Sequence, residues 1–149
     1  MKYIIIGGVA GGATAAARLR RVDEKSDILL LEKGKYISYA NCGLPYYIGG
    51  VIDEREKLLV QTPASFGQRF RVDVRVENEV IGIHPQNKTI TVRTVDGGEY
   101  EETYDKLLLS PGATPVRPPL EGIDSEGIFT LRNRSEERRV GKECRSRWS

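Results

Sequence analysis

The chain has 149 residues, which is enough for one modest domain with a hydrophobic core. Hydrophobic residues make up 39% of it and charged residues 30%, as in a soluble globular protein. The glycine-rich apolar opening is too short for a membrane-spanning helix and lacks the order of charges of a signal peptide. These properties give no reason to expect a membrane protein.

The end of the chain differs from the rest. Residues 134–149 hold one Val and one Trp among charges and show no apolar periodicity, so they cannot bury a face. Their start, Arg-Ser-Glu-Glu-Arg, is what the nucleotides agatcggaagagcgt encode, and these begin a common sequencing adapter. We therefore expect a native domain in residues 1–133 and a non-native, disordered tail in residues 134–149.

Without that tail the net charge falls from +2 to −1, which gives no argument for nucleic acid as a partner. Cys144 also disappears, and Cys42 is then the one cysteine left. One thiol builds neither a disulfide framework nor a cysteine-rich zinc site, so we expect no metal. A lone thiol suits a reducing cytoplasm, where we place the protein.

The first elements in chain order predict a right-handed βαβ unit. The apolar run KYIII reads as a buried parallel strand, and the Ala-rich segment GGATAAARLRR reads as a helix that ends in arginines. The second buried strand is DILLLE, residues 27–32.

The later elements complete an α/β fold. Thr62 is placed to cap a short helix with Pro63 at its first position. A third strand follows in VDVRV, and three further strands, separated by the turn segments HPQNK and DGG, predict an antiparallel meander. The run KLLLSPGA returns to a buried strand, followed by a Pro-rich extended exit. We therefore predict a Rossmann-like three-layer sandwich, with a parallel sheet and a small antiparallel meander.

The turn after the first strand, Gly7 to Gly12, predicts a dinucleotide site. Against the pattern GxGxxG, Gly7 and Gly12 match and Val9 stands at the middle glycine. Glu32 follows Gly12 by 20 residues, where a carboxylate accepts hydrogen bonds from an adenosine ribose. Since Glu32 would repel a 2′-phosphate, FAD or NAD fits better than NADP. Alternatively, the glycines serve packing alone and Glu32 is a solvated strand end.

Cys42 lies in the segment NCGLPYYIGG, which predicts the start of a short helix with Asn41 as its cap and Pro45 in its first turn. A thiol reacts as the thiolate, which a helix amino terminus favours. Without a second protein thiol, Cys42 can hold a mixed disulfide with a small thiol or cycle through sulfenic acid. Alternatively, Cys42 is a buried small hydrophobic residue.

Three segments, IIIGGVAGGATAAARLRR, SYANCGLPYYIGG and TYDKLLLSPGA, together resemble the amino-terminal FAD segment of the single-cysteine pyridine nucleotide–disulfide oxidoreductases. Within that group they are most similar to coenzyme A–disulfide reductases. The resemblance implies that residues 1–133 are the amino-terminal part of an FAD/NAD(P)-binding domain, and that the nicotinamide site and a dimerisation domain lie outside this chain. It implies a full-length homodimer and an inactive fragment.

The resemblance also implies a chemical route. NAD(P)H reduces FAD, the flavin reduces a mixed disulfide between Cys42 and CoA, and the Cys42 thiolate then attacks the next CoA disulfide. The residues implied for FAD are Gly7, Gly8, Val9, Ala10, Gly12, Glu32, Lys33, Val80, Ser110, Pro111 and Gly112. The residues implied for CoA are Thr14, Arg18, Arg21, Ser38 and Asn41. For Arg18 and Arg21, a solvated helix end is the alternative.

Three other functions stay open. Related NADH peroxidases and oxidases carry a histidine where this chain has Ala10, and the one histidine, His84, falls in a predicted hairpin. This favours thiol substrates over oxygen, without separating CoA disulfide from persulfides or polysulfides. An NAD(P)H oxidase of the same family and a non-catalytic dinucleotide-binding module with an inert cysteine are the remaining alternatives.

Overall fold

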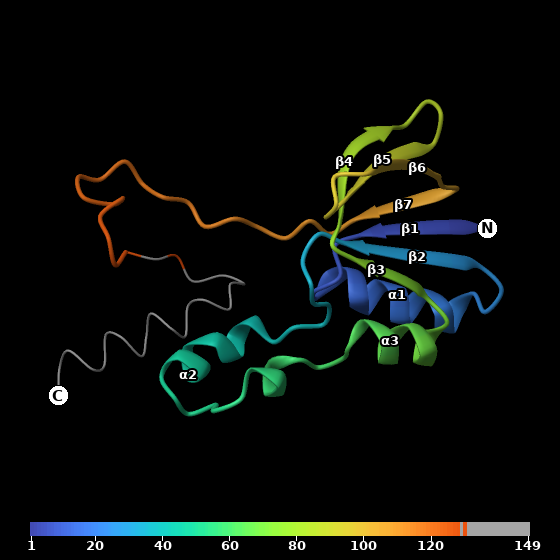
Figure 1. The fold of residues 1–149 in the computed structure, drawn as a ribbon. Helices are drawn as coiled ribbons and strands as arrows, with labels where there is room; N and C mark the ends of the chain where they lie inside the picture. The colour runs from blue at the N-terminus through green and yellow to red at the C-terminus, as the bar shows by residue number, and fades with distance from the viewer. Residues whose placement is uncertain (129, 131–149) are drawn as a thin grey trace. The chain divides into compact units, whose positions relative to one another are not determined.

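The structure is a computed structural model that describes residues 1–128 and 130. These divide into two compact units, and the first contains residues 1–39 and 59–112. Its centre is a parallel sheet in the order β3-β2-β1-β7, which Figure 1 shows. The strands are β1 (Lys2–Ile6), β2 (Asp27–Glu32), β3 (Asp73–Val76) and β7 (Lys106–Leu109).

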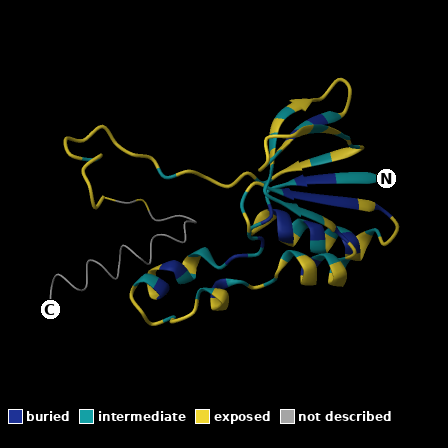
Figure 2. Ribbon diagram, viewed as in Figure 1, coloured by how far each residue is buried: buried dark blue, intermediate teal, exposed yellow. Residues whose placement is uncertain are grey.

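Two helices, α1 (Gly11–Val22) and α3 (Pro63–Phe70), cover one face of this sheet. Because side chains alternate along a strand, Ile5, Ile28 and Leu30 point to this face. They form a buried cluster with Ala16 of α1 and Phe66 of α3. Figure 2 shows this buried centre in the strands β1 and β2.

The second face is covered by an antiparallel meander of β4 (Asn78–His84), β5 (Thr89–Thr94) and β6 (Glu99–Thr103). The opposite alternation directs Ile4, Leu29 and Leu31 to this side, where they pack against Ile90 and Val92 of β5. Helices, parallel sheet and meander therefore form three layers, as the sequence predicts.

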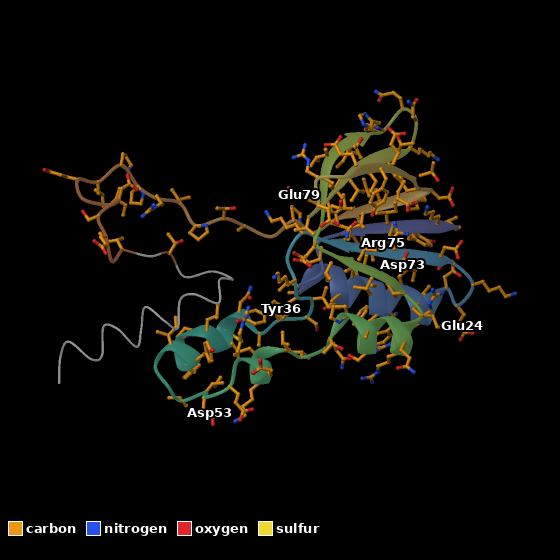
Figure 3. The ribbon with its side chains drawn as sticks, in the orientation of Figure 1. Glu24, Tyr36, Asp53, Asp73, Arg75 and Glu79 are labelled. Atoms are coloured by element: carbon orange, nitrogen blue, oxygen red, sulfur yellow. The ribbon has the colours of Figure 1, made fainter. Side chains whose placement is uncertain are left out.

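A polar cluster, here called the inter-sheet bridge, ties the meander to the parallel sheet. Glu102 of β6 accepts hydrogen bonds from Lys2 of β1 and from Arg75 of β3, the latter at 2.7 Å. Arg75 also pairs with Asp73, and both extend from β3 in Figure 3. Burial of the Glu102 carboxyl acts to raise its pKa, but the hydrogen bonds from Lys2 and Arg75 outweigh burial and lower it below the usual 4.5.

The second unit includes residues 40–58. It contains two short 3₁₀ turns, Asn41–Gly43 and Arg55–Leu58, with the five-residue helix α2 (Leu44–Ile48) between them. The N–H of Ala40 donates to the carbonyl of Leu58 at 2.8 Å and closes the segment into a loop. Its buried side chains are Leu44, Tyr47 and Leu58.

Most predicted elements are confirmed, including the Thr62 cap, which forms a capping box with Ser65. The strand predicted in KLLLSPGA is present as β7, but it is mostly exposed and not buried, because it is the edge of the described sheet. The predicted cap at Asn41 is wrong. The amino-terminal boundary residue of α2 is Gly43, and neither α2 nor the turn before it has a side-chain cap. The chain makes a 3₁₀ turn over Asn41–Gly43 first, so Asn41 lies too early to cap α2. The predicted tail, residues 134–149, lies outside the described residues.

Candidate functional site

The glycine turn between β1 and α1 is packed so closely that two of its glycines have no room for a side chain. Gly7 has a φ of +95°, and a Cβ there would overlap the carbonyl oxygen of Ser110 and stand 2.8 Å from its carbon. A Cβ at Gly12 would overlap the carbonyl oxygen of Gly7 and stand 3.0 Å from Ile5 Cγ2. The turn thus brings β1, α1 and the segment after β7 together.

The amino terminus of α1 is open toward this turn. Ala10 precedes the helix without a side-chain hydrogen bond to it, and the first turn of α1 contains no acidic residue. The first backbone N–H groups of a helix lack partners within the helix and form the positive end of its dipole. This arrangement favours an anion such as a diphosphate.

Glu32, at the end of β2, lies beside the same turn. Its Oε2 accepts a hydrogen bond from the N–H of Gly8 at 2.7 Å, and its Oε1 accepts one from the N–H of Gly34 at 2.8 Å. Each carboxylate oxygen has a further lone pair, so Glu32 can still accept hydrogen bonds from the hydroxyls of a ribose.

A groove of about 440 Å³ runs between α1 and the segment 60–70, beside the glycine turn. Thr14 and Arg21 line it from α1, and Val9 and Ala10 line it from the turn. Ser38 also lines it. Three of the five residues predicted for CoA therefore share one groove with two residues predicted for FAD.

Ser38 is held in that groove by the backbone. Its N–H donates to the carbonyl of Gly8 at 2.9 Å, and its own carbonyl accepts from the N–H of Val60 at 2.9 Å. Its φ of +50° is unusual for a residue other than glycine and marks a strained conformation, which is common at functional sites.

Sequence reasoning missed the opposite wall of the groove. Arg69 and Phe70 line it from α3, and Tyr39 and Gln61 line it as well. One feature of the sequence could have indicated Arg69 as an anion-binding residue, because a second arginine, Arg71, follows it at the end of the predicted helix. Only the packing of α3 beside α1, however, shows that Arg69 and Arg21 belong to one groove.

Arg18 does not join this group. It lines a second, mostly apolar groove of about 430 Å³ with Tyr3, Leu19, Leu107 and Leu108. This groove runs between α1 and β7, which is the edge strand of the described sheet. Arg18 therefore lines a different groove from Thr14 and Arg21, although it is their neighbour on the surface of α1.

The remaining predicted FAD residues lie at different depths. Ser110 is half-buried, and its N–H donates to the carbonyl of Ile6 at 2.7 Å, which anchors the Ser110–Gly112 turn beside β1. Pro111 and Lys33 are exposed. Val80 of β4 is half-buried and packs against the cluster between the two sheets.

Cys42 and Asn41 belong to the second unit. The Cys42 thiol is exposed and forms no disulfide, so it is not the buried hydrophobic residue of the alternative interpretation. The side-chain oxygen Oδ1 of Asn41 is buried and accepts no hydrogen bond from the described residues. A buried acceptor without a donor lowers the stability of the structure around it.

Two further properties concern the described residues alone. They contain no group of three or more His, Cys, Asp or Glu side chains arranged to hold a metal ion. None of their helices is both long enough and apolar enough to cross a bilayer.

His84 is exposed at the end of β4, with its Nε2 3.1 Å from Thr91 Oγ1.

The fold and the glycine turn are those of a dinucleotide-binding domain, and comparison with known proteins identifies the family. The family model of the pyridine nucleotide-disulphide oxidoreductases matches residues 1–145, so the chain belongs to this family. The match crosses the boundary predicted at residue 133, and that boundary stays a prediction.

Individual relatives narrow the comparison. The chain is 46% identical over 133 residues to the coenzyme A disulfide reductase of Staphylococcus aureus, which covers 89% of this chain and 30% of the relative. It also resembles the structure of reduced Bacillus anthracis CoADR-RHD, with 50% identity and a TM-score of 0.91 over 99% of this chain and 27% of that one.

A NAD-dependent persulfide reductase from A. fulgidus is similar too, with 38% identity and a TM-score of 0.88 over 99% of this chain and 27% of that one. The chain thus spans under a third of the length of the relatives that it matches.

Proposed function

We propose that this chain is part of an FAD-dependent NAD(P)H:disulfide oxidoreductase that reduces CoA disulfide through Cys42. The observation that carries the proposal is the groove beside the glycine turn, where Thr14, Arg21 and Ser38 come together with Arg69. Cys42 follows Ser38 by four residues, and its thiol is exposed. The identity of 46% to a coenzyme A disulfide reductase supports the same substrate.

The residues present fit a dinucleotide cofactor. The uncapped start of α1 would hold a diphosphate, and Glu32 would accept hydrogen bonds from a ribose. The close packing of Gly7 against Ser110 and of Gly12 against Gly7 would hold the amino terminus of α1 beside the diphosphate. FAD, when bound, supplies the electron pair that the reaction takes from NAD(P)H.

The groove fits the phosphate-bearing end of CoA. Arg21 and Arg69 line it from two helices, and a planar guanidinium can bind a phosphate through two parallel hydrogen bonds. Tyr39, Phe66 and Phe70 add aromatic surface to the same groove. Such mixed lining suits a ligand that combines anionic groups with an aromatic base and an aliphatic arm.

Cys42 would act as the nucleophile. Its thiolate attacks one sulfur of CoA disulfide, so the bond between the two CoA sulfurs breaks, a Cys42–CoA mixed disulfide forms and one CoA thiolate leaves. Two electrons then cleave the mixed disulfide, which releases the second CoA and restores the Cys42 thiolate. Asn41 directly precedes Cys42 and would face the incoming CoA.

The nicotinamide site would lie in the part of the longer protein that this chain lacks. The protein would work as a homodimer, without nucleic acid or a membrane as a partner. A related function, reduction of persulfides, is favoured by the similarity to the A. fulgidus persulfide reductase at 38% identity. Both substrates need the same attacking thiolate and differ in the group that the groove must hold.

The test uses the full-length flavoprotein under anaerobic conditions. NADH or NADPH oxidation is measured with CoA disulfide, a polysulfide and oxygen as separate acceptors. We expect turnover with CoA disulfide and little with oxygen. Faster turnover with polysulfide would favour the persulfide reductase, and oxygen as the sole acceptor would contradict the proposal.

A further inference from the structure

Arg20 is the charged residue that α1 buries, with an exposed fraction of only 9%. All the acceptors that the described residues offer to its guanidinium are backbone carbonyls. Its Nε donates to Phe70 at 2.9 Å and its Nη2 donates to Arg71 at 2.7 Å. Its Nη1 donates to Asp23 at 3.2 Å and to Glu24 at 2.9 Å.

These four carbonyls come from the ends of two helices. Phe70 and Arg71 end α3, and Asp23 and Glu24 follow the last turn of α1, where Figure 3 labels Glu24. Carbonyls at a helix carboxyl end lack partners within the helix and form the negative end of its dipole. Arg20 therefore places one positive charge at the carboxyl end of α3 and just beyond the carboxyl end of α1.

The end of α3 needs such support because it is strained. Arg71 closes the helix in the left-handed conformation, with a φ of 49° and a ψ of 51°. A non-glycine residue pays about 1 kcal/mol or more for this conformation. The two hydrogen bonds from Arg20 hold the carbonyls of Phe70 and Arg71, which lie before and after the Arg71 Cα, and so stabilise this ending.

The hydrogen bonds from Arg20 to the end of α3 also affect the geometry of the groove. Arg69 and Phe70, which line one wall, stand immediately before the carbonyl of Arg71 that Arg20 holds. Arg21, which lines the other wall, follows Arg20 directly in α1. The distance between Arg21 and Arg69 thus depends on Arg20, which does not itself line the groove, as well as on the apolar packing of α1 and α3.

We propose that Arg20 is a positioning residue for substrate binding, which fastens the end of α3 to α1 so that Arg69 and Arg21 face the same phosphate-bearing ligand. The proposal rests on the proposed function, because it takes CoA disulfide as that ligand. It adds a residue that contacts neither substrate nor cofactor and that controls affinity through the geometry of the groove.

The test compares Arg20→Met and Arg20→Lys with a matched control, Arg93→Met, in the full-length flavoprotein. Arg93 is an exposed arginine of the meander that pairs with Glu99. For Arg20→Met we expect KM for CoA disulfide to rise about tenfold while kcat stays within about twofold. Arg20→Lys keeps the charge but has a shorter side chain with a single nitrogen. Its KM for CoA disulfide should lie between those of the wild type and Arg20→Met.

A double variant separates positioning from general destabilisation. If Arg20 acts through Arg69, then Arg69→Met should raise KM strongly in the wild type and only weakly in the Arg20→Met background. Independent, additive effects of the two substitutions on KM would overturn the proposal, as would an unchanged KM in Arg20→Met. If Arg20→Met does not fold, the same cycle is run with Arg20→Lys.

A second measurement distinguishes failure of the proposed function from failure of the Arg20 proposal. If the wild type does not turn over CoA disulfide, that function is wrong, and the Arg20 proposal is then decided by hydrogen exchange of the backbone amides of residues 67–72. Faster exchange in Arg20→Met than in Arg93→Met supports the fastening of α3. Equal exchange in the two variants overturns it.

Discussion

Substitution of two adjacent glycines of α1 offers a sharp test of the glycine turn. Gly11 and Gly12 both lie in the first turn of the helix, and neither has a positive φ. A Cβ at Gly12 would meet backbone atoms of Gly7. A Cβ at Gly11 would meet only the Ser110 hydroxyl, at 2.6 Å, which can rotate away. We expect Gly12→Ala to be disruptive and Gly11→Ala to be tolerated.

The magnitudes follow from what must move. In Gly12→Ala the turn between β1 and α1 has to open, because a backbone carbonyl cannot rotate away as a side chain can. We expect a loss of about 3 kcal/mol in the free energy of unfolding, the upper part of the range for overpacking. In Gly11→Ala the higher helix propensity of alanine, about 0.5–1 kcal/mol, offsets the smaller displacement of Ser110.

The assay is urea unfolding of the full-length flavoprotein, with the flavin-to-protein ratio measured by absorbance. Gly12→Ala should lower the urea midpoint by about 0.5 M or more, since m rises with the size of the protein, and should lose flavin. Gly11→Ala should keep a midpoint close to that of the wild type. Equal behaviour of the two variants would mean that the close approach of Gly12 to Gly7 does not shape the site, and the reasoning would fail.

Three further predictions concern other parts of the molecule. Because the pKa of Glu102 is lowered on folding, its contribution to stability is complete above the usual value of 4.5 and is lost as the pH falls through the lower folded value. Glu102→Gln should therefore cost about 1–2 kcal/mol at pH 7 in urea unfolding and flatten the acid dependence, and a parallel pH profile would contradict this. Cys42→Ser in the full-length protein should keep flavin and lose CoA disulfide turnover, whereas retained turnover would exclude Cys42 as the nucleophile. The isolated 149-residue chain should neither oxidise NADPH nor retain FAD in gel filtration, and measurable NADPH oxidation would disprove this.

The layers of the fold could be predicted because each strand carries its own periodicity. The continuous apolar runs of β1 and β2 indicate burial on both faces, and the structure directs Ile5 to the helices and Ile4 to the meander. The turn segments HPQNK and DGG predicted the hairpins that connect β4, β5 and β6. The inter-sheet bridge could not be predicted, since Lys2 and Glu102 are 100 residues apart and neither belongs to a motif.

The candidate site was partly predictable for a similar reason. The position of Glu32 could be predicted from its spacing to the glycine turn, because both lie at strand ends of the same βαβ unit. Arg69 depends on how α3 packs beside α1, and no local pattern encodes that contact. Arg18 and Arg21 are neighbours on α1 and look alike in the sequence, yet they line different grooves, because β7 lies beside one and α3 beside the other. The Asn41 cap failed because a 3₁₀ turn delays the start of α2.

The exposure of β7 at the edge of the described sheet affects how such a polypeptide should be expressed. Leu109 is 59% exposed and Leu108 is 38% exposed, next to an apolar groove at the border of the described sheet. Uncovered strand borders of this kind attract other chains. Recombinant products that stop soon after β7 should collect in inclusion bodies, and gene designs for expression should therefore run well past it.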